Sequence, residues 1–359
     1  MFYLFNPHSN WFGQLIMVTL YLTFVIALLV ISWTAYKHFS PYAHHPRDYE
    51  EWYFFNEYGR QVKFPSWSDE ATLDLSIIVP AYNEQYRLRP MLNSCLHWLF
   101  KVKKSSFEVI VVSDGSTDRT REIVMEYVQV YGAEQIRLLE LNKNRGKGGA
   151  VCLGMENARG RKLLFADADG ATQFKDLEKL ETELQLLLKK ANVNHNDDND
   201  VDNDDDNDDD NDDDDDDKLD NNSDDICAVV CGSRAHLETE AKAQRSAFRT
   251  LLMIGFHIHV WMFGVRSIKD TQCGFKLFTR SAARILFPNL HVGRWAFDVE
   301  LLYIAEKLNM KLAEVAVNWK EIEGSKIVPV WSWLQMGIDV FSIWIKYRTG
   351  LWKIHEKID

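Results

Sequence analysis

From residue 75 the chain alternates short apolar runs with amphipathic segments, and this alternation limits the possible folds more than any other feature. Short runs rich in Val, Ile and Leu are typical of buried strands. They occupy residues 75–80, 107–115, 136–141, 162–167 and 226–233. Helical spacing is found at residues 87–102, 117–131 and 174–190. Alternating strands and helices of this kind predict an α/β fold with a mostly parallel, doubly wound sheet flanked by helices.

A tract of aspartate and asparagine, residues 192–225, interrupts the pattern before the last of these strands. Residues 197–225 contain 19 aspartates and one lysine, and so carry a net charge of −18. Such a segment cannot bury enough apolar surface to fold, and we predict a disordered insert in a loop. A low-complexity insertion explains it better than a calcium-buffering role. The whole chain carries −12, so the remainder carries +6, which favours anionic ligands or a membrane surface.

The cysteines indicate the redox compartment. There are five of them, an odd number without a zinc-site spacing, and Cys227 and Cys231 lie within an apolar run. Buried thiols in a reducing compartment are the expected outcome.

The N-terminal region contains 19 consecutive uncharged, mostly apolar residues, from Leu15 to Trp33. A run of this length can cross a bilayer as a helix. Neither a basic start nor a small-residue cleavage site accompanies it, so we predict a transmembrane helix over 13–36 and not a cleaved signal peptide. The basic residues that follow then place residues 1–12 in the lumen and the rest of the chain, beginning with a juxtamembrane segment at 37–70, in the cytosol.

Two further apolar segments, 251–265 and 330–354, have helical character. The first is too short to span a membrane, and the second carries Asp339 near its middle, which disfavours spanning. Both are rich in Trp, Phe and Ile. We predict that they lie in the membrane interface, so that 327–359 forms amphipathic interface helices. Packing in the protein core is the alternative for each.

Polar loops follow four of the predicted strands, where open α/β sheets bind their ligands. These loops are Pro80 to Glu84, 113–116, 144–149 and 167–170. The third is glycine-rich and basic and opens a helix, so its backbone N–H groups and helix dipole favour phosphate. It is not a Walker A loop, and no G-x-G-x-x-G follows the first strand, which excludes those two markers of nucleotide binding.

Asp167 and Asp169 end the fourth strand two residues apart, as Asp-Ala-Asp-Gly. Side chains two apart in an extended segment point the same way, so both carboxylates can face one ligand. Carboxylate oxygens suit Mg²⁺ or Mn²⁺, which such sites share with substrate phosphates. An ordinary turn is the alternative, because Asp and Gly are common turn residues.

Arginines follow the fifth strand. Arg245 and Arg249 are four residues apart and so share a helix face, and Arg234 precedes them. Arginine clusters bind phosphate in bidentate fashion, and the apolar segment 251–265 comes next. The sequence therefore predicts a lipid-phosphate site, with solvent-facing arginines as the alternative. Farther along, Asp298 lies in an apolar run, where it is either a general base or a helix cap.

Eight segments, in order, resemble the eukaryotic dolichyl-phosphate β-glucosyltransferases, which are inverting family-2 glycosyltransferases with a GT-A fold. They are SIIVPAYNE, VSDGSTD, NRGKGGAV, ADADGAT, CGSRAHL, DTQCGFKLF, RWAFDVELLYIA and EIEGSKIVPVWSWLQMG. The resemblance covers about residues 75–350, includes the single N-terminal helix, and implies a catalytic domain over 71–326. It implies transfer of glucose from UDP-glucose to dolichyl phosphate at the cytosolic face of the endoplasmic reticulum membrane, for N-glycan precursor assembly. No nucleic-acid partner is expected.

The same resemblance implies a donor site. The residues that would line the nucleotide pocket are Pro80, Tyr82, Glu84 and Asp114, with Asp114 reading the uracil. Lys147 would lie near the nucleotide and its phosphates. Asp167 and Asp169 match the family's DXD motif, with Asp169 on Mg²⁺ or Mn²⁺ and Asp167 beside the nucleotide.

The acceptor site and the catalytic residues are implied in the same way. Arg234, Arg245 and Arg249 resemble the ligands of the acceptor phosphate. Asp298 aligns with the position where other inverting members carry a base, so the catalytic set is Asp169, Arg234 and Asp298. Ser113 departs from the pattern, since relatives often have Asp there.

Elementary chemistry limits the role of Asp298. A phosphate monoester has a second pKa of about 6, so dolichyl phosphate is already largely anionic at neutral pH. We therefore expect Asp298 to position groups and not to act as an essential base.

Two alternatives remain open. One is a dolichyl-phosphate mannosyltransferase that uses GDP-mannose, and the other is a membrane-tethered nucleotide-sugar-binding protein without catalysis. A processive polysaccharide synthase is disfavoured, because several spanning helices and a Q-x-x-R-W motif are missing from the sequence.

Overall fold

The computed structural model describes residues 17–26, 46–103, 105–197, 226–237, 255, 259–322 and 329–356. The chain divides into two units, Met1–Pro41 and Tyr42–Asp359. Within the first unit, residues 17–26 are helical, with large apolar side chains such as Tyr21 and Phe24 exposed. None of the helices in the described part of the chain is both long and apolar enough to cross a membrane.

A seven-stranded sheet runs through the second unit in the order β5-β4-β3-β6-β8-β7-β9. Its strands are β3 (Leu73–Ala81), β4 (Phe107–Asp114), β5 (Ile136–Leu141), β6 (Gly160–Ala166), β7 (Ala228–Ser233), β8 (Phe275–Thr279) and β9 (Lys311–Ala316). The four strands from β5 to β6 are parallel, as expected, and β9 is parallel to β7. Strand β8 is antiparallel to β6 and β7 and was not predicted.

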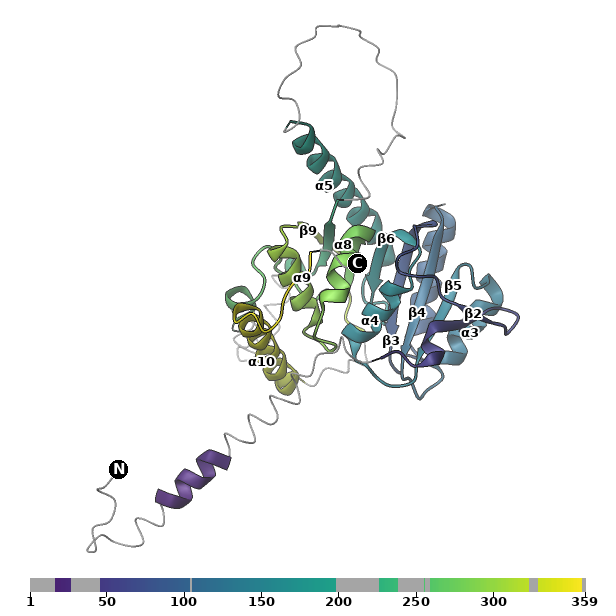
Figure 1. Ribbon diagram of the computed structural model, residues 1–359. Coiled ribbons are helices and arrows are strands. Elements are labelled where there is room, and N and C mark those ends of the chain that lie inside the picture. Colours follow the sequence, from purple (N-terminus) through teal and green to yellow (C-terminus); the bar gives the residue numbers. More distant parts are fainter. Residues whose placement is uncertain are drawn as a thin grey trace, which may run out of the picture. The chain divides into compact units, whose positions relative to one another are not determined.

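Helices cover both faces of this sheet (Figure 1). The main helices are α2 (Leu88–Trp98), α3 (Thr120–Tyr131), α4 (Lys147–Glu156), α5 (Leu177–Asp197), α8 (Arg280–Leu286), α9 (Phe297–Lys307) and α10 (Pro329–Arg348). Helix α4 packs against β3, β4 and α9, and α8 also contacts α9, while α2 and α3 contact each other. Helix α5 packs against β7 and β9. This three-layer arrangement with a mostly parallel sheet confirms the expected α/β fold class.

Shorter elements complete the described fold. They are η2 (Tyr49–Trp52), β1 (Tyr53–Phe55), β2 (Gln61–Lys63), a π-helical turn η3 (Leu99–Lys103), η4 (Phe174–Asp176) and η7 (Phe287–Asn289). Strands β1 and β2 form a separate antiparallel hairpin. All five cysteines are free thiols, and four of them are buried, Cys227 being partly exposed.

Two predicted boundaries need correction. Helix α5 continues to Asp197 and so includes the first six residues of the predicted insert, because each added residue gains a backbone hydrogen bond once a helix exists. The rest of the insert, 198–225, lies outside the described residues. The predicted helix over 330–354 ends at Arg348, since Gly350 has a φ of +72° and turns the chain back.

The two predicted interface segments pack against each other through one face. In the described part of segment 251–265, the Phe263 ring packs against the rings of Phe341 and Trp344 in α10, with 5.3 Å between ring centres in each case. Helix α10 buries Val340 and Ile343 against the core. Several large apolar side chains of the described parts of these segments are exposed, namely Trp261, Met262, Ile338, Phe341, Ile345 and Leu351. Core packing therefore accounts for one side of α10 only.

Candidate active site

The polar loops at the carboxyl ends of β3, β4, β5 and β6 meet at one edge of the sheet, as the sequence predicts. The loop after β3 contacts the loop after β4, where the backbone N–H of Asn83 donates to Ser116 Oγ at 3.1 Å. The loop after β5 contacts the loop after β6, where Lys147 Nζ lies 2.7 Å from Asp167 Oδ1. Four segments distant in sequence thus form one site.

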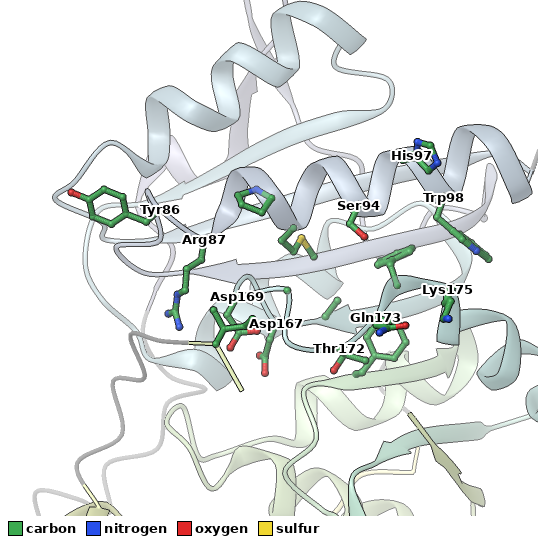
Figure 2. A pocket seen from close by; sticks show the side chains of 17 residues that line it. Tyr86, Arg87, Ser94, His97, Trp98, Asp167, Asp169, Thr172, Gln173 and Lys175 are labelled. Carbon is green, nitrogen blue, oxygen red and sulfur yellow. The ribbon is translucent and has the colours of Figure 1, made fainter. Parts of the chain in front are cut away.

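Asp167 and Asp169 line a pocket of about 540 Å³ between α2 and the loop after β6. Figure 2 shows Arg87 reaching from just before α2 toward the two carboxylates. Burial, with the neighbouring Asp167 carboxylate as the second cause, raises the pKa of Asp169. Ala171 N–H donates to Asp169 Oδ1 at 2.9 Å. Two carboxylates held close in a partly buried site are suited to a divalent cation.

Gly274 lies directly against Asp167. No role for this glycine follows from the sequence alone. The Asp167 N–H donates to the Gly274 carbonyl at 3.0 Å. A Cβ atom at position 274 would lie 1.9 Å from Asp167 Oδ2, so any side chain there would displace the carboxylate. Gly274 therefore provides the space in which Asp167 meets Lys147.

Asp114 holds the glycine-rich loop through its carboxylate. The carboxylate accepts the backbone N–H groups of Arg145 at 2.7 Å and Gly146 at 3.0 Å. Gly146 has a φ of +82°, a conformation that glycine adopts without strain. Burial raises the pKa of Asp114 to about 6, although these hydrogen bonds oppose the rise. Asp114 is thus the link between β4 and the start of α4.

The other predicted donor residues lie on the loop after β3. Pro80 is partly buried, Tyr82 is 40% exposed, and Glu84 is buried. Glu84 accepts two hydrogen bonds from Arg87, at 2.6 and 2.7 Å, so this carboxylate orients the arginine that faces the aspartate pair. Arg87 was not predicted, because an arginine in a loop gives no signal of its own.

Arg234 follows β7 and binds Asp270 in bidentate fashion. Its Nε and Nη2 donate to the two carboxylate oxygens at 2.7 and 2.8 Å, and its guanidinium lies 5.5 Å from the centre of the Trp319 ring. Burial would raise the pKa of Asp270, but Arg234 outweighs it and holds the pKa below its usual value. Arg245 and Arg249, the other predicted phosphate ligands, lie outside the described residues.

Asp298 is buried at the first turn of α9 and pairs with Lys276 of β8. Lys276 Nζ lies 2.5 Å from Asp298 Oδ1 and also donates to the Cys273 carbonyl at 2.7 Å. Burial lowers the pKa of Lys276, yet the adjacent carboxylate outweighs it, and the pKa is raised. Side-chain exposures of 0% and 4% leave this pair closed to solvent.

Residues 270–278, quoted above as DTQCGFKLF, are therefore central to the site. This one segment supplies the partner of Arg234, the backing of Asp167 and the partner of Asp298. A lysine within the apolar run of β8 was the available signal, since a buried lysine requires a partner.

The carboxylate ligands available in this site fit a divalent metal that is shared with a substrate. Among the described residues, no group of three or more His, Cys, Asp or Glu side chains is placed to hold a metal ion. The two carboxylates of Asp167 and Asp169 remain, and Mg²⁺ commonly binds one or two carboxylates together with phosphate oxygens and water. The residues therefore fit a metal that arrives with a diphosphate.

Comparison with known proteins finds one matching family model and several relatives that share one name. Residues 76–187 match the glycosyl transferase family 2 model. The dolichyl-phosphate β-glucosyltransferase of Drosophila melanogaster is 50% identical over 335 residues, which is 92% of this chain and 92% of that protein. The human and Saccharomyces cerevisiae proteins of the same name are 47% and 35% identical, covering 92% and 94% of this chain and 93% and 96% of theirs.

A solved structure is more distant. Glucosyl-3-phosphoglycerate synthase of Mycobacterium tuberculosis, in complex with Mn²⁺, UDP-glucose and phosphoglyceric acid, aligns with a TM-score of 0.44 at 15% identity. The alignment covers 78% of this chain and 80% of that one.

Proposed function

The chain belongs to the dolichyl-phosphate β-glucosyltransferases, and on this premise we propose that its donor is UDP-glucose and that a divalent metal, Mg²⁺ or Mn²⁺, assists the transfer. It is an enzyme that transfers glucose to dolichyl phosphate. Its α/β fold with a mostly parallel central sheet is GT-A-like.

One observation carries the proposal for the donor. Asp167 and Asp169 face a pocket at the end of β6, with Lys147 at 2.7 Å from Asp167 and Arg87 alongside. This arrangement suits a metal–diphosphate group. The carboxylates match the positive metal, and the cationic side chains and the helix start match the negative diphosphate. Bound there, the metal would neutralise charge that develops on the departing diphosphate.

Different residues then bind the different parts of the UDP-glucose donor. Asp169 and Asp167 hold the metal, and Lys147, at the positive end of the α4 dipole, binds a diphosphate oxygen. Asp114 accepts the uracil N–H. The nucleotide is enclosed by the loop after β3, through Pro80, Tyr82 and Glu84.

The acceptor phosphate is held by Arg234. An arginine has five N–H donors, and Asp270 accepts from Nε and Nη2 in this site, so the phosphate would bind the remaining donors. Arg245 and Arg249 complete the acceptor site in this proposal. A phosphate oxygen attacks C1 from the side opposite UDP, the C1–O bond to UDP breaks, and the configuration inverts from α to β.

The proposed role of Asp298 is to position groups. Its carboxylate pairs with Lys276 and is sealed from solvent, which suits a fixed charge better than a proton carrier. The nucleophile is already anionic, as argued above. Asp298→Asn should therefore retain turnover in the molecules that fold, although stability should fall because Lys276 is left buried without its charged partner. Loss of turnover, together with loss of a titrating group from the pH–rate profile, would establish a base instead.

Attachment to the endoplasmic reticulum membrane is proposed from two features. The uncharged run from Leu15 to Trp33 would anchor the chain, with the catalytic unit on the cytosolic side. The exposed Trp261, Phe341 and Ile345 offer an apolar surface to the membrane interface. Protease treatment of sealed microsomes should degrade the catalytic unit, and its protection inside the vesicles would contradict the proposed orientation.

Donor identity is tested directly with full-length protein in detergent, dolichyl phosphate, and labelled UDP-glucose or GDP-mannose. We expect a lipid-linked hexose from UDP-glucose only, and its loss on metal chelation. Product from GDP-mannose alone would contradict the donor assignment. Nucleotide binding with no product from either donor would instead favour a binding protein.

A further inference from the structure

The segment that precedes the catalytic domain contacts the base of the donor site. Residues 46–64 contain η2, β1 and β2, and both η2 and β1 pack against β5. In sequence this segment lies between the apolar N-terminal run and β3. It belongs to the same compact unit as the catalytic residues.

Glu51, in η2, binds the arginine of the glycine-rich loop. Its Oε2 lies 2.6 Å from Arg145 Nη2, with side-chain exposures of 0% and 9%. The same Nη2 donates to the Pro46 carbonyl at 3.2 Å. The backbone N–H of Arg145 is held by Asp114, so the residue that opens the loop is restrained at both its backbone and its side chain.

The segment also contacts the far end of α4. Arg47 forms an ion pair with Glu156, the last residue of that helix, and its guanidinium lies 4.4 Å from the centre of the Trp52 ring. The segment therefore touches both ends of the helix whose first residue, Lys147, reaches Asp167. Through these contacts the position of α4 depends on residues outside the catalytic core.

Stability alone does not account for this arrangement. Glu51 is 1% exposed, and its Oε1 has no hydrogen-bond partner among the described residues. A buried carboxylate oxygen without a partner reduces stability. Glu51 Oε2 accepts the Asp48 N–H that caps η2 as well as pairing with Arg145, so the carboxylate joins η2 to the glycine-rich loop.

We propose that Glu51 is a positioning residue that holds the glycine-rich loop, through Arg145, in the geometry that binds the donor diphosphate. The segment that follows the N-terminal run would then be part of the donor site. This inference rests on the proposed donor site, in which Lys147 and the start of α4 bind the diphosphate.

The test compares UDP affinity and steady-state kinetics of full-length wild type with Glu51→Gln, which keeps the shape but removes the charge. We expect UDP binding, measured with Mn²⁺ present, to weaken about tenfold, because a charge-assisted hydrogen bond is lost. The KM for UDP-glucose should rise similarly, while the KM for dolichyl phosphate stays unchanged. Glu50→Gln is the matched control, since Glu50 is exposed in the same turn and accepts a hydrogen bond from Asn142 at 3.3 Å, with no ion pair to it among the described residues.

A second variant changes the arginine of the same ion pair. Arg145→Gln should weaken UDP binding as much as Glu51→Gln, and the double variant should be no weaker than either single one. Additive effects, or equal UDP affinity in wild type and Glu51→Gln, would overturn the positioning role. A wild-type chain that binds no UDP would refute the proposed donor site, which is a distinguishable result.

Discussion

Two lysine–aspartate pairs, built from the same chemistry, differ in their access to solvent. Lys147 and Asp167 lie 2.7 Å apart with side-chain exposures of 16% and 35%, while Lys276 and Asp298 lie 2.5 Å apart with 0% and 4%. Asp167 of the open pair lines the pocket, and in the proposed function this pair exchanges its mutual contact for a metal and a phosphate. The closed pair cannot do so without leaving a buried charge. Burial, and not residue type, separates the accessible pair from the closed one.

The largest effect on activity is expected at the accessible aspartates that line the pocket. Asp169→Asn should reduce glucosyl transfer at least about a thousandfold, because the metal loses a charged ligand and the diphosphate its neutralising partner. The measurement is the rate of lipid-linked glucose formation at saturating UDP-glucose. Asp74→Asn is the control, since Asp74 lies near the opposite end of β3 and accepts hydrogen bonds from Ser106. Substantial activity in Asp169→Asn would contradict the metal–diphosphate role proposed for the accessible aspartates.

Breaking the closed pair should affect folding first. Lys276→Met leaves Asp298 buried without its partner and should lower the free energy of unfolding by about 3–5 kcal/mol. Lys162→Met is the control, because the Lys162–Glu181 pair is 30% and 13% exposed and should lose about 1 kcal/mol or less. Urea unfolding measures both variants. If the two lose equal stability, the closed pair is not the scaffold that its burial indicates.

The pH dependence sharpens the comparison at Asp114, whose pKa rises from 3.8 to about 6 on folding through burial. Between these values the folded state binds the additional proton, so stability falls as pH rises from about 4 to 6 and this contribution is constant above 6. The full effect is on the order of 3 kcal/mol. Activity should change in the opposite direction, because the ionised carboxylate is the better acceptor for the glycine-rich loop.

Unfolding measured across this pH range in wild type and Asp114→Asn tests the assignment. The variant should show a smaller fall in stability than wild type, because the pKa of Asp339 is also raised to about 6 by burial and that group remains. Equal slopes in the two proteins would show that Asp114 is not the titrating group.

The smallest expected effect is at Arg234, which is half-buried and is fixed by Asp270 through its Nε and Nη2. Arg234→Lys keeps the charge but cannot make a bidentate contact, so the KM for dolichyl phosphate should rise about tenfold, with the KM for UDP-glucose unchanged. Arg121→Lys is the control at an exposed pair with Glu140. A change confined to the UDP-glucose KM would move Arg234 from the acceptor to the donor side.

Much of the parallel half of the fold was predictable because its signals are local. The strands β3, β4, β5 and β6 are short apolar runs, and each is followed by a polar loop within a few residues. The parallel arrangement then brings those loops to one edge without further information. The positions of Asp114, Lys147, Asp167 and Asp169 at this edge were predicted in this way.

The second half was harder to predict because its contacts are distant in sequence. Strand β8 enters between β6 and β7 in the antiparallel direction, and no periodicity in the chain indicates that order. Arg234 reaches Asp270 across 36 residues, and Lys276 reaches Asp298 across 22. The roles of Gly274 and Arg87 likewise appear only when the elements are assembled.

By itself, the sequence determined the chemistry at this site: an aspartate pair at a strand end, a basic glycine-rich loop, and arginines beside apolar segments. Tertiary structure alone decided which charges remain accessible. Two lysine–aspartate pairs are indistinguishable in the printed sequence, since solvent exposure depends on what packs around them. Burial between β8 and α9 makes one pair a fixed support, and the open edge of the sheet leaves the other accessible, because a charge can change partners only where water or ligand can reach it.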